Sequence, residues 1–220
     1  MKVSLVSSST PSAELQAQGI VNCQELVAYC ARVSNPANQT NTETSEKLIR
    51  YLIKHAHWSP LEMVSACLEI ETTRDIARQI LRHRSFSFQE FSQRYAVADL
   101  GVEYKEARLQ DAKNRQNSIE VDNPELQDLW EEKQAQVVLA SKQAYDWALN
   151  NGIAKEQARA VLPEGITTSR LYMQGTLRSW LHYIELRSGP ETQKEHREIA
   201  RSAAAALATI FPMITEFLKD

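Results

Sequence analysis

The spacing of apolar side chains changes several times along the chain, and each change marks an expected element. Residues 2–6 and 166–173 predict short strands. Residues 63–71 predict a longer strand, because every second side chain is apolar and these side chains face one way. They are Val64, Ala66, Leu68 and Ile70.

Elsewhere the apolar side chains recur every three or four residues, which is the period of an α-helix. The longest such run, residues 124–150, begins with Asn123-Pro124 and ends at Asn151-Gly152, the usual residue types at helix ends. Its apolar stripe consists of Leu126, Leu129, Val137, Ala140, Ala144 and Trp147. Further helices are expected over residues 21–33, 43–56, 154–162, 176–187 and 191–210.

Two more helix starts carry capping patterns. Residues 59–62 (SPLE) have the S-x-x-E spacing of a capping box, with proline at the first helical position. Thr72 with Asp75 predicts a second cap, which opens a helix that continues to about Arg82. Residues 83–95 then favour an irregular or extended segment.

The middle of the chain and its overall composition indicate how many domains to expect. Residues 100–121 are polar and predict at most a strand followed by a loop. The 220 residues are enough for one large or two small domains, and 43% of them are hydrophobic. Because no repeat, low-complexity linker or break in composition divides the chain, residues 1–220 are expected to form a single domain.

Charge and cysteine content narrow the function classes. The formal net charge is -3, which gives no overall attraction to nucleic acid or to an anionic membrane. An odd number of cysteines without a pairing pattern argues against a disulfide framework. No secretory signal or membrane span is expected, so the chain is assigned to a reducing cytoplasm.

Positive charge is nevertheless concentrated in one place. Arg74, Arg78 and Arg82 are four residues apart and share one face of the expected helix, and His83 and Arg84 follow at once. The plainest interpretation is a solvated helix face. A second is a nucleotide-binding or RNA-binding surface.

The next residues favour a nucleotide. Residues 85–95 supply hydroxyls, an amide and the carboxylate of Glu90. Arginines and hydroxyls on an irregular segment are suited to hold phosphate. Glu90 is expected either to pair with the arginines or to accept a hydrogen bond from a ribose hydroxyl or a base edge. Three phenylalanines are expected to anchor the segment in the core: Phe86, Phe88 and Phe91.

This segment resembles the signature of the flavin-dependent thymidylate synthases, Arg-His-Arg-x-x-Ser-x-Asn-Glu-x-Ser-x-Arg-Tyr. Only Gln89 departs from it, in place of asparagine. The resemblance extends over about residues 31–197. The matching positions in the signature are Arg82, His83, Arg84, Ser87, Glu90, Ser92, Arg94 and Tyr95. Similar segments elsewhere are residues 31–34 (ARVS), 54–62 (KHAHWSPLE), 158–163 (ARAVLP) and 177–187.

The resemblance implies an enzyme that makes thymidylate from dUMP. The carbon would come from methylenetetrahydrofolate, and the hydride from NADPH through bound FAD. The implied fold is α+β, an antiparallel sheet with long helices. The implied assembly is a homotetramer with active sites at subunit interfaces, and neither a nucleic acid nor a membrane is an expected partner.

The resemblance also assigns site residues by position. Arg187 would be the catalytic residue, since a guanidinium held against the pyrimidine stabilises the anion that develops when carbon is added. No metal site is expected. The nucleotide would contact Gln79, Arg82, Glu90, Ser92, Arg94, Arg159 and Arg187, with Arg94 and Arg159 at its phosphate. FAD would contact His57, Ser59, Arg82, His83, Arg84, Glu90, Thr176, Arg178 and His182.

Several of these residues have simpler interpretations. Arg187 lies near a helix C-terminus, where the dipole favours a cation, and Arg159 is placed to cap a short helix. Arg178 and His182 form an i, i+4 pair that would suit a solvated face. His57 with His55 is a weak metal-ligand pattern.

Departures from the family pattern leave other functions open. Thr176 stands where asparagine is common, and His196 replaces an apolar residue. The three cysteines lie in apolar contexts, so none is expected to be a nucleophile. Besides the enzyme, a nucleotide- or RNA-binding module and a catalytically inactive relative remain possible.

Overall fold

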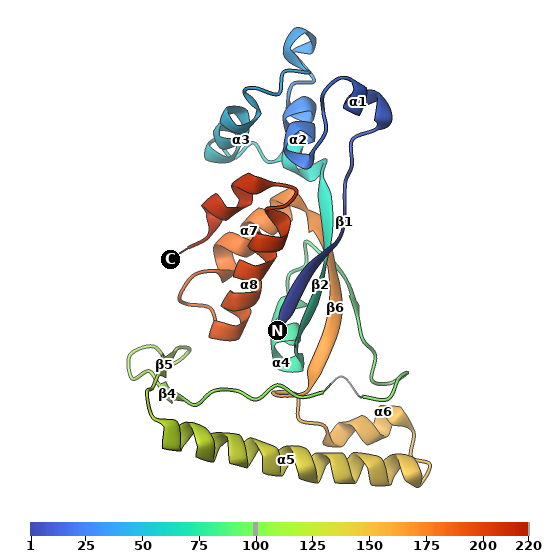
Figure 1. Cartoon of the computed structure of the whole chain (residues 1–220), viewed down its shortest axis with the longest axis vertical. Helices are drawn as coiled ribbons and strands as arrows, with labels where there is room; N and C mark the ends of the chain where they lie inside the picture. The colour runs from blue at the N-terminus through green and yellow to red at the C-terminus, as the bar shows by residue number, and fades with distance from the viewer. Residues whose placement is uncertain (99–100, 220) are drawn as a thin grey trace.

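A four-stranded antiparallel sheet forms the centre of the computed structural model, which describes residues 1–98 and 101–219 (Figure 1). The strands lie in the order β1-β2-β6-β3. They are β1 (Lys2–Ser8), β2 (Ser65–Thr73), β6 (Thr168–Thr176) and β3 (Ser87–Glu90). The expected strands and the α+β class are confirmed, and residues 83–95 contain the short strand β3.

One face of the sheet is apolar and buried. In the register of β2 with β6, Leu68 is opposite Met173 and Ile70 is opposite Leu171, and all four side chains are buried. The helices α7 (Leu177–Arg187) and α8 (Lys194–Leu207) cover this face (Figure 1). The alternation predicted for residues 63–71 is therefore confirmed, since burial of every second side chain fits a strand with one covered face.

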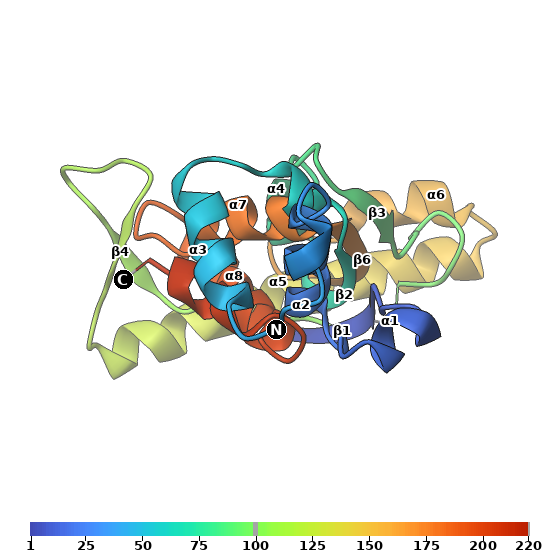
Figure 2. The same cartoon turned by 90° about the horizontal axis from the view of Figure 1, so that it is seen from above.

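The remaining helices lie at the two ends of the sheet. The N-terminal helices occupy the upper end in Figure 1 and lie nearest the viewer in Figure 2. These are α1 (Ala13–Ala17), α2 (Cys23–Ala31) and α3 (Ser45–Lys54). The lower end carries α5 (Pro124–Asn150) and α6 (Lys155–Ala158), and α4 (Arg74–Ile80) follows β2 directly. Short 3-10 helices span Pro36–Asn38, Ser59–Glu62, Arg159–Val161 and Pro212–Phe217.

A small hairpin precedes α5. It consists of β4 (Arg108–Gln110) and β5 (Ser118–Glu120), which pair antiparallel. The sequence predicted only a strand and a loop over residues 100–121, and residue 100 lies outside the described residues. Of the described residues, none forms a helix long and apolar enough to cross a bilayer.

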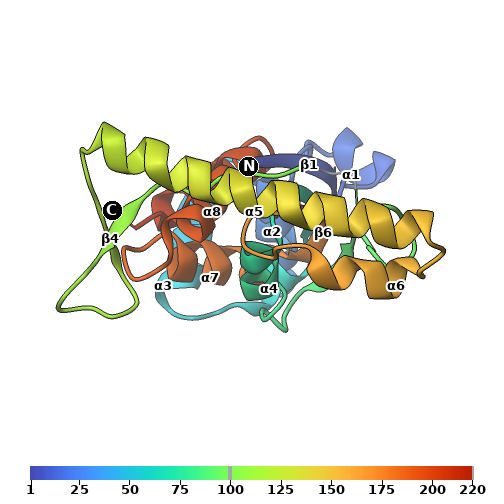
Figure 3. The ribbon, with the colours of Figure 1, turned by 90° about the horizontal axis from the view of Figure 1, so that it is seen from below.

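The apolar stripe of α5 is largely uncovered. Leu129, Val137 and Trp147 expose 48%, 52% and 62% of their surface. Seen from below, α5 runs along the whole lower side of the molecule (Figure 3). Its attachment is partly polar, since the Gln134 side chain bonds both the N–H and the carbonyl of Lys105. The helix bounds were predicted correctly, but the stripe is not a core contact within this chain.

Both predicted caps are wrong. Ser59 lies inside its 3-10 helix and makes no capping bond, while Glu62 accepts a hydrogen bond from Arg178. Thr72 is still part of β2, where it pairs with Ser169, so α4 begins one residue later than the predicted cap implies. Both errors have the same cause, because residues far along the chain compete for the groups that a local pattern would assign to a cap.

A glycine permits close contact between β6 and the segment that follows α4. A Cβ atom at Gly175 would lie 2.4 Å from Cδ1 of Phe86, whose ring packs edge-on against Trp180 at a centroid distance of 4.8 Å. We expect Gly175→Ala to lower the free energy of unfolding by about 1–3 kcal/mol, because overpacking shifts a buried ring. Chemical denaturation measures this. Gly165→Ala is the control, since a Cβ there meets nothing within 4 Å, and equal stability of the two variants would contradict the expected clash.

Candidate active site

Helices α4, α7 and α8 bring polar side chains together beside the core. We define the polar junction as Gln79, His83, Tyr183, Arg187, Gln193 and His196. Arg187 Nε donates to His83 Nε2 at 3.0 Å, and the His83 ring meets Tyr183 edge-on at 5.0 Å between centroids. The fold thus joins Gln79, His83 and Arg187, three of the residues expected at the site, in one cluster.

The polar junction keeps both of its histidines neutral. Burial lowers the pKa of His83 to about 4, and the charges of Arg187 and Arg82 act in the same direction. Burial also lowers the pKa of His196 to about 3, again assisted by Arg187 and by His83. A neutral His83 offers a lone pair at Nε2, so it can accept the Arg187 hydrogen bond and hold the guanidinium in place.

Glu90 is held by arginines, one of the two roles considered for it. Its carboxylate lies 3.5 Å from Arg74 Nη1 and 4.0 Å from Arg78 Nη1, and it accepts a hydrogen bond from Ser169 Oγ at 2.9 Å. Arg74 is almost fully buried and also pairs with Glu164 at 3.2 Å. The expected arginine face is therefore not a uniform solvated surface, because its first member lies inside the protein.

Both arginines expected at a phosphate contact Glu156 of α6, one at its carboxylate and one at its backbone carbonyl. Arg94 Nη2 lies 3.5 Å from the Glu156 carboxylate, and Arg159 Nε donates to the Glu156 carbonyl at 3.3 Å. Arg94 and Glu156 line an open hollow of about 680 Å³. Arg159 is also the C-cap residue of α6, so its simpler interpretation and its expected role are compatible.

Several residues expected at FAD lie where η2 (Ser59–Glu62) meets α7. Arg178 donates to Glu62, and the rings of Trp58 and His182 lie 4.4 Å apart. The Thr176 side chain accepts a hydrogen bond from the Ser179 N–H and caps α7, which is a structural role for this departure from the family pattern. His57 is exposed, and its ring lies 6.2 Å from that of His55.

The remaining signature side chains point outward. Arg82, Arg84 and Ser92 are exposed. The site residues thus fall into four groups: the polar junction, Glu90 with its arginines, Arg94 with Glu156, and Arg178 with Glu62. Within residues 1–98 and 101–219, no side-chain hydrogen bond or ion pair links one of these groups to another. In the described part of one chain, these groups are therefore not joined by polar contacts.

Comparison with known proteins shows which family shares this sequence. Residues 19–213 match the family model described as thymidylate synthase complementing protein. The chain is 48% identical over 221 residues to the flavin-dependent thymidylate synthase of Synechocystis sp., covering 100% of both chains. It belongs to the flavin-dependent thymidylate synthase family.

Two further relatives agree with this membership. The chain is 45% identical over 218 residues to the probable flavin-dependent thymidylate synthase of Paramecium bursaria Chlorella virus 1, covering 99% of each chain. A crystal structure of the UMP/dUMP methylase PolB from Streptomyces cacaoi, bound with 5-Br dUMP, superposes with a TM-score of 0.83 at 25% identity. That comparison covers 98% of this chain and 93% of the other.

Flavin-dependent thymidylate synthase motifs did not indicate every residue that holds the site together. Tyr183 contacts His83, Glu156 pairs with Arg94, and Glu164 pairs with Arg74 of the arginine face. No local pattern singled out these three residues. Glu195 belongs to the same group, since it bonds Arg108 from 87 residues away in the sequence. Their contacts are tertiary. In each case an element distant in the sequence brings a polar side chain to an arginine, histidine or glutamine.

The surroundings of the three thiols bear on whether this member of the family could use a cysteine nucleophile. Burial raises the pKa of Cys23, Cys30 and Cys67, which disfavours the thiolate. In the described part of the chain, no three side chains with metal-ligating groups lie together.

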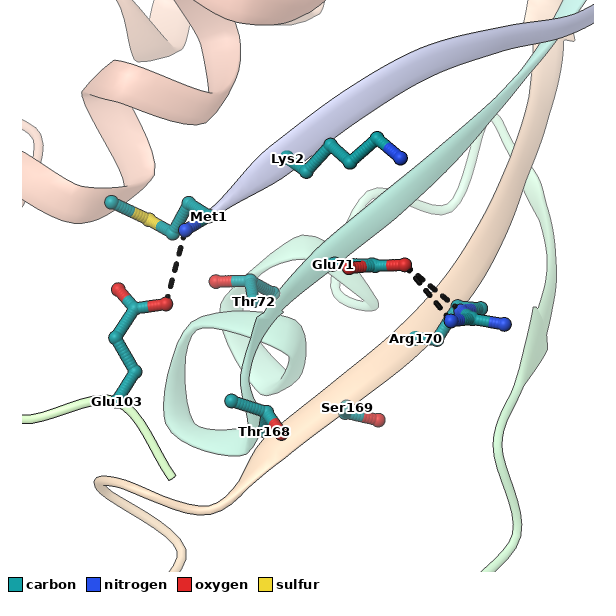
Figure 4. A pocket seen from close by; sticks show the side chains of 8 residues that line it. All are labelled: Met1, Lys2, Glu71, Thr72, Glu103, Thr168, Ser169 and Arg170. Carbon is teal, nitrogen blue, oxygen red and sulfur yellow. Dashed lines mark hydrogen bonds and ion pairs between the residues drawn. The ribbon is translucent and has the colours of Figure 1, made fainter. Parts of the chain in front are cut away.

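A separate polar pocket of about 180 Å³ lies at the N-terminal end of β1 (Figure 4). The Met1 amino group lies 3.1 Å from the Glu103 carboxylate, and Arg170 pairs with Glu71 at 2.9 Å. Its charged walls thus include two internal ion pairs. None of the residues expected at the nucleotide or at FAD lines it.

Proposed function

We propose that the chain methylates dUMP to dTMP, with methylenetetrahydrofolate as carbon donor, NADPH as reductant, FAD as cofactor and no cysteine nucleophile. The observation that carries this proposal is the hydrogen bond from Arg187 to His83 at 3.0 Å. It ties the expected catalytic arginine to the signature segment, although the two are 104 residues apart in sequence. The raised pKa values of the thiols support a reaction without a cysteine nucleophile.

The residues present fit FAD. Arg82, Arg84 and Arg178 provide guanidinium groups suited to a pyrophosphate, and Ser59 adds a hydroxyl. His57 and His182 provide rings that can lie against a flavin, and Trp58 already contacts His182. Bound FAD would supply the hydride that reduces the transferred carbon.

The nucleotide phosphate is assigned to Arg94 and Arg159. Both already contact Glu156, and both have the forked donors that bind phosphate in bidentate fashion. In this proposal the phosphate replaces the Glu156 carboxylate as the partner of Arg94. Ser92 adds a hydroxyl from the same segment.

The base is assigned to the polar junction, beside Gln79 and Arg187. Addition of carbon to the pyrimidine needs electron density on the ring, and the Arg187 guanidinium stabilises the negative charge that develops. Arginine stays protonated at any working pH, so its charge is always available. His83 accepts the Nε hydrogen bond and thereby orients the rest of the guanidinium towards the base.

Separate groups on one chain favour an active site shared between subunits. We propose a homotetramer of single-domain chains, residues 1–220, with the exposed apolar side chains of α5 as contact area. Leu129, Val137 and Trp147 would lose solvent exposure on assembly, which favours association. We also propose that the enzyme works in the cytoplasm, because all three thiols are unpaired.

Two measurements test the proposed function. We expect the purified protein, reconstituted with FAD, to show flavin absorption that changes when dUMP is added. We also expect its gene to rescue a bacterium that requires thymidine. Absence of both signals would contradict the proposal, and a strongly salt-dependent affinity for RNA with no effect of dUMP would favour the RNA-binding alternative.

A further inference from the structure

A continuous chain of hydrogen bonds runs from the Arg108–Glu195 ion pair through the polar junction to Tyr183. Arg108 Nη2 donates to Glu195 Oε1 at 2.6 Å, and Gln193 Nε2 donates to Glu195 Oε2 at 2.9 Å. Gln79 Nε2 donates to Gln193 Oε1 at 2.8 Å, and Gln79 Oε1 lies 3.2 Å from Nδ1 of His196. The chain finishes at Tyr183, whose hydroxyl lies 3.1 Å from His196 Nε2.

Only one end of this hydrogen-bond chain has a fixed polarity. An ionised carboxylate can only accept hydrogen bonds, whereas a carboxamide, a neutral imidazole and a phenol can each reverse their roles. Glu195 is buried and pairs with Arg108, whose side chain is itself only 11% exposed. Burial alone would raise the pKa of Glu195, but hydrogen bonds from its own backbone N–H and from Gln193, with the Arg108 charge, bring it below its ordinary value.

The fixed end determines every later bond. Because Glu195 accepts, Gln193 must present its NH₂ group there and its oxygen to Gln79. Gln79 must then donate with Nε2 and accept with Oε1, which requires a proton on His196 Nδ1. A neutral His196 consequently accepts at Nε2 from the hydroxyl of Tyr183.

We propose that Glu195 is a positioning residue whose carboxylate sets the orientation of the Gln79 carboxamide at the nucleotide. This inference rests on the proposed function, in which Gln79 contacts the base. The two bonds of Gln79 use one donor and one lone pair, and a carboxamide has two of each, so capacity remains for a ligand. Reversal of the amide would set its NH₂ group against a hydrogen-bond donor of the base, or its oxygen against an acceptor.

Glu195→Gln tests the proposal by removing the fixed polarity while keeping the shape of the side chain. Glu195 accepts from Arg108 on one oxygen and from Gln193 on the other, whereas glutamine has a single oxygen. The stronger charged donor, Arg108, is expected to take that oxygen, which turns the new NH₂ group towards Gln193. Gln193 and Gln79 then reverse, and the proton of His196 moves to Nε2.

The first readout is the tautomer of His196, measured by ¹⁵N NMR of histidine-labelled protein and assigned with His196→Asn. We expect Nδ1–H in the wild-type protein and Nε2–H in Glu195→Gln. The second readout is nucleotide binding, where we expect the Kd for dUMP to rise roughly tenfold through the mispaired amide. FAD stoichiometry should not change, because Gln79 is not among the FAD contacts.

Matched variants separate positioning from a general structural role. Glu198→Gln makes the same change at an exposed site on α8 and should leave both readouts at the wild-type value. Glu195→Asp keeps an obligate acceptor and should preserve the tautomer. A wild-type Nε2–H tautomer, or a Glu195→Gln protein with unchanged tautomer and unchanged Kd, would overturn the proposal even if the variant is less stable.

The same experiment distinguishes the two proposals. Wild-type protein that fails to bind dUMP but shows the Nδ1–H tautomer and its reversal would refute the proposed function while leaving the hydrogen-bond polarity established. In that case Glu195 would still orient Gln79, but not for a nucleotide. The wild-type tautomer needs no variant, so failure of Glu195→Gln to fold does not remove the test.

Discussion

Arg187→Ala is expected to reduce thymidylate formation by roughly 100- to 1000-fold, the loss typical of removing one preorganised charge at a developing anion. The variant should still bind FAD, since Arg187 belongs to the nucleotide side of the proposed site. Steady-state turnover and the bound-flavin spectrum of the same preparation measure the two effects. Unchanged turnover would refute the catalytic role of Arg187.

A lysine variant, with a control at another arginine, shows which property of Arg187 matters. Arg187→Lys keeps the positive charge but loses the forked geometry and the Nε donor that bonds His83 at 3.0 Å. Most of the loss in turnover should therefore persist in the lysine variant. Arg201→Ala, an exposed arginine on the neighbouring helix α8, is the control and should retain full turnover. Full recovery in Arg187→Lys would show that charge alone suffices.

Local sequence patterns predicted the elements well, because their signals lie within the elements. The bounds of α5 follow from a proline at its start and from Asn151-Gly152 at its end, and both act within a single turn. The cap expected at Thr72 failed because β6 pairs with β2 as far as Thr73. The cap expected from Ser59 and Glu62 failed because Arg178, 116 residues away, takes the carboxylate.

The residues of the candidate site also divide into those that a local pattern could predict and those that only the fold brings together. A motif of fourteen residues located His83 and Arg94, since spacing along one segment is a local property. It could not indicate that His83 contacts Arg187, or that Arg94 pairs with Glu156, because those contacts join elements that are distant in the sequence. The sequence showed His196 only as a replacement for an apolar residue. The side chain is buried, and its hydrogen bonds to Gln79 and Tyr183 arise from the fold.

His196 is expected to make the protein less stable as the pH falls from neutral. Its folded-state pKa of about 3 lies well below the ordinary value of 6.5, because the ring is buried near Arg187 and His83. Between these two values the unfolded chain binds a proton that the folded protein does not, so falling pH favours unfolding. From pH 7 to pH 5 this single group should cost about 2 kcal/mol of unfolding free energy.

His196→Asn should flatten this pH dependence by removing the titrating group. The slope would not vanish, because the pKa of His83 is also lowered and that residue remains. Denaturation curves at pH 7 and pH 5, at one protein concentration, give the difference for each variant, and the exposed His55→Asn serves as control. The readout is a difference between two pH values, so a uniform loss of stability in His196→Asn does not affect it. An identical pH dependence in wild type and His196→Asn would mean that His196 does not stay neutral inside the polar junction, and the polarity inferred from Glu195 to Tyr183 would then fail with it.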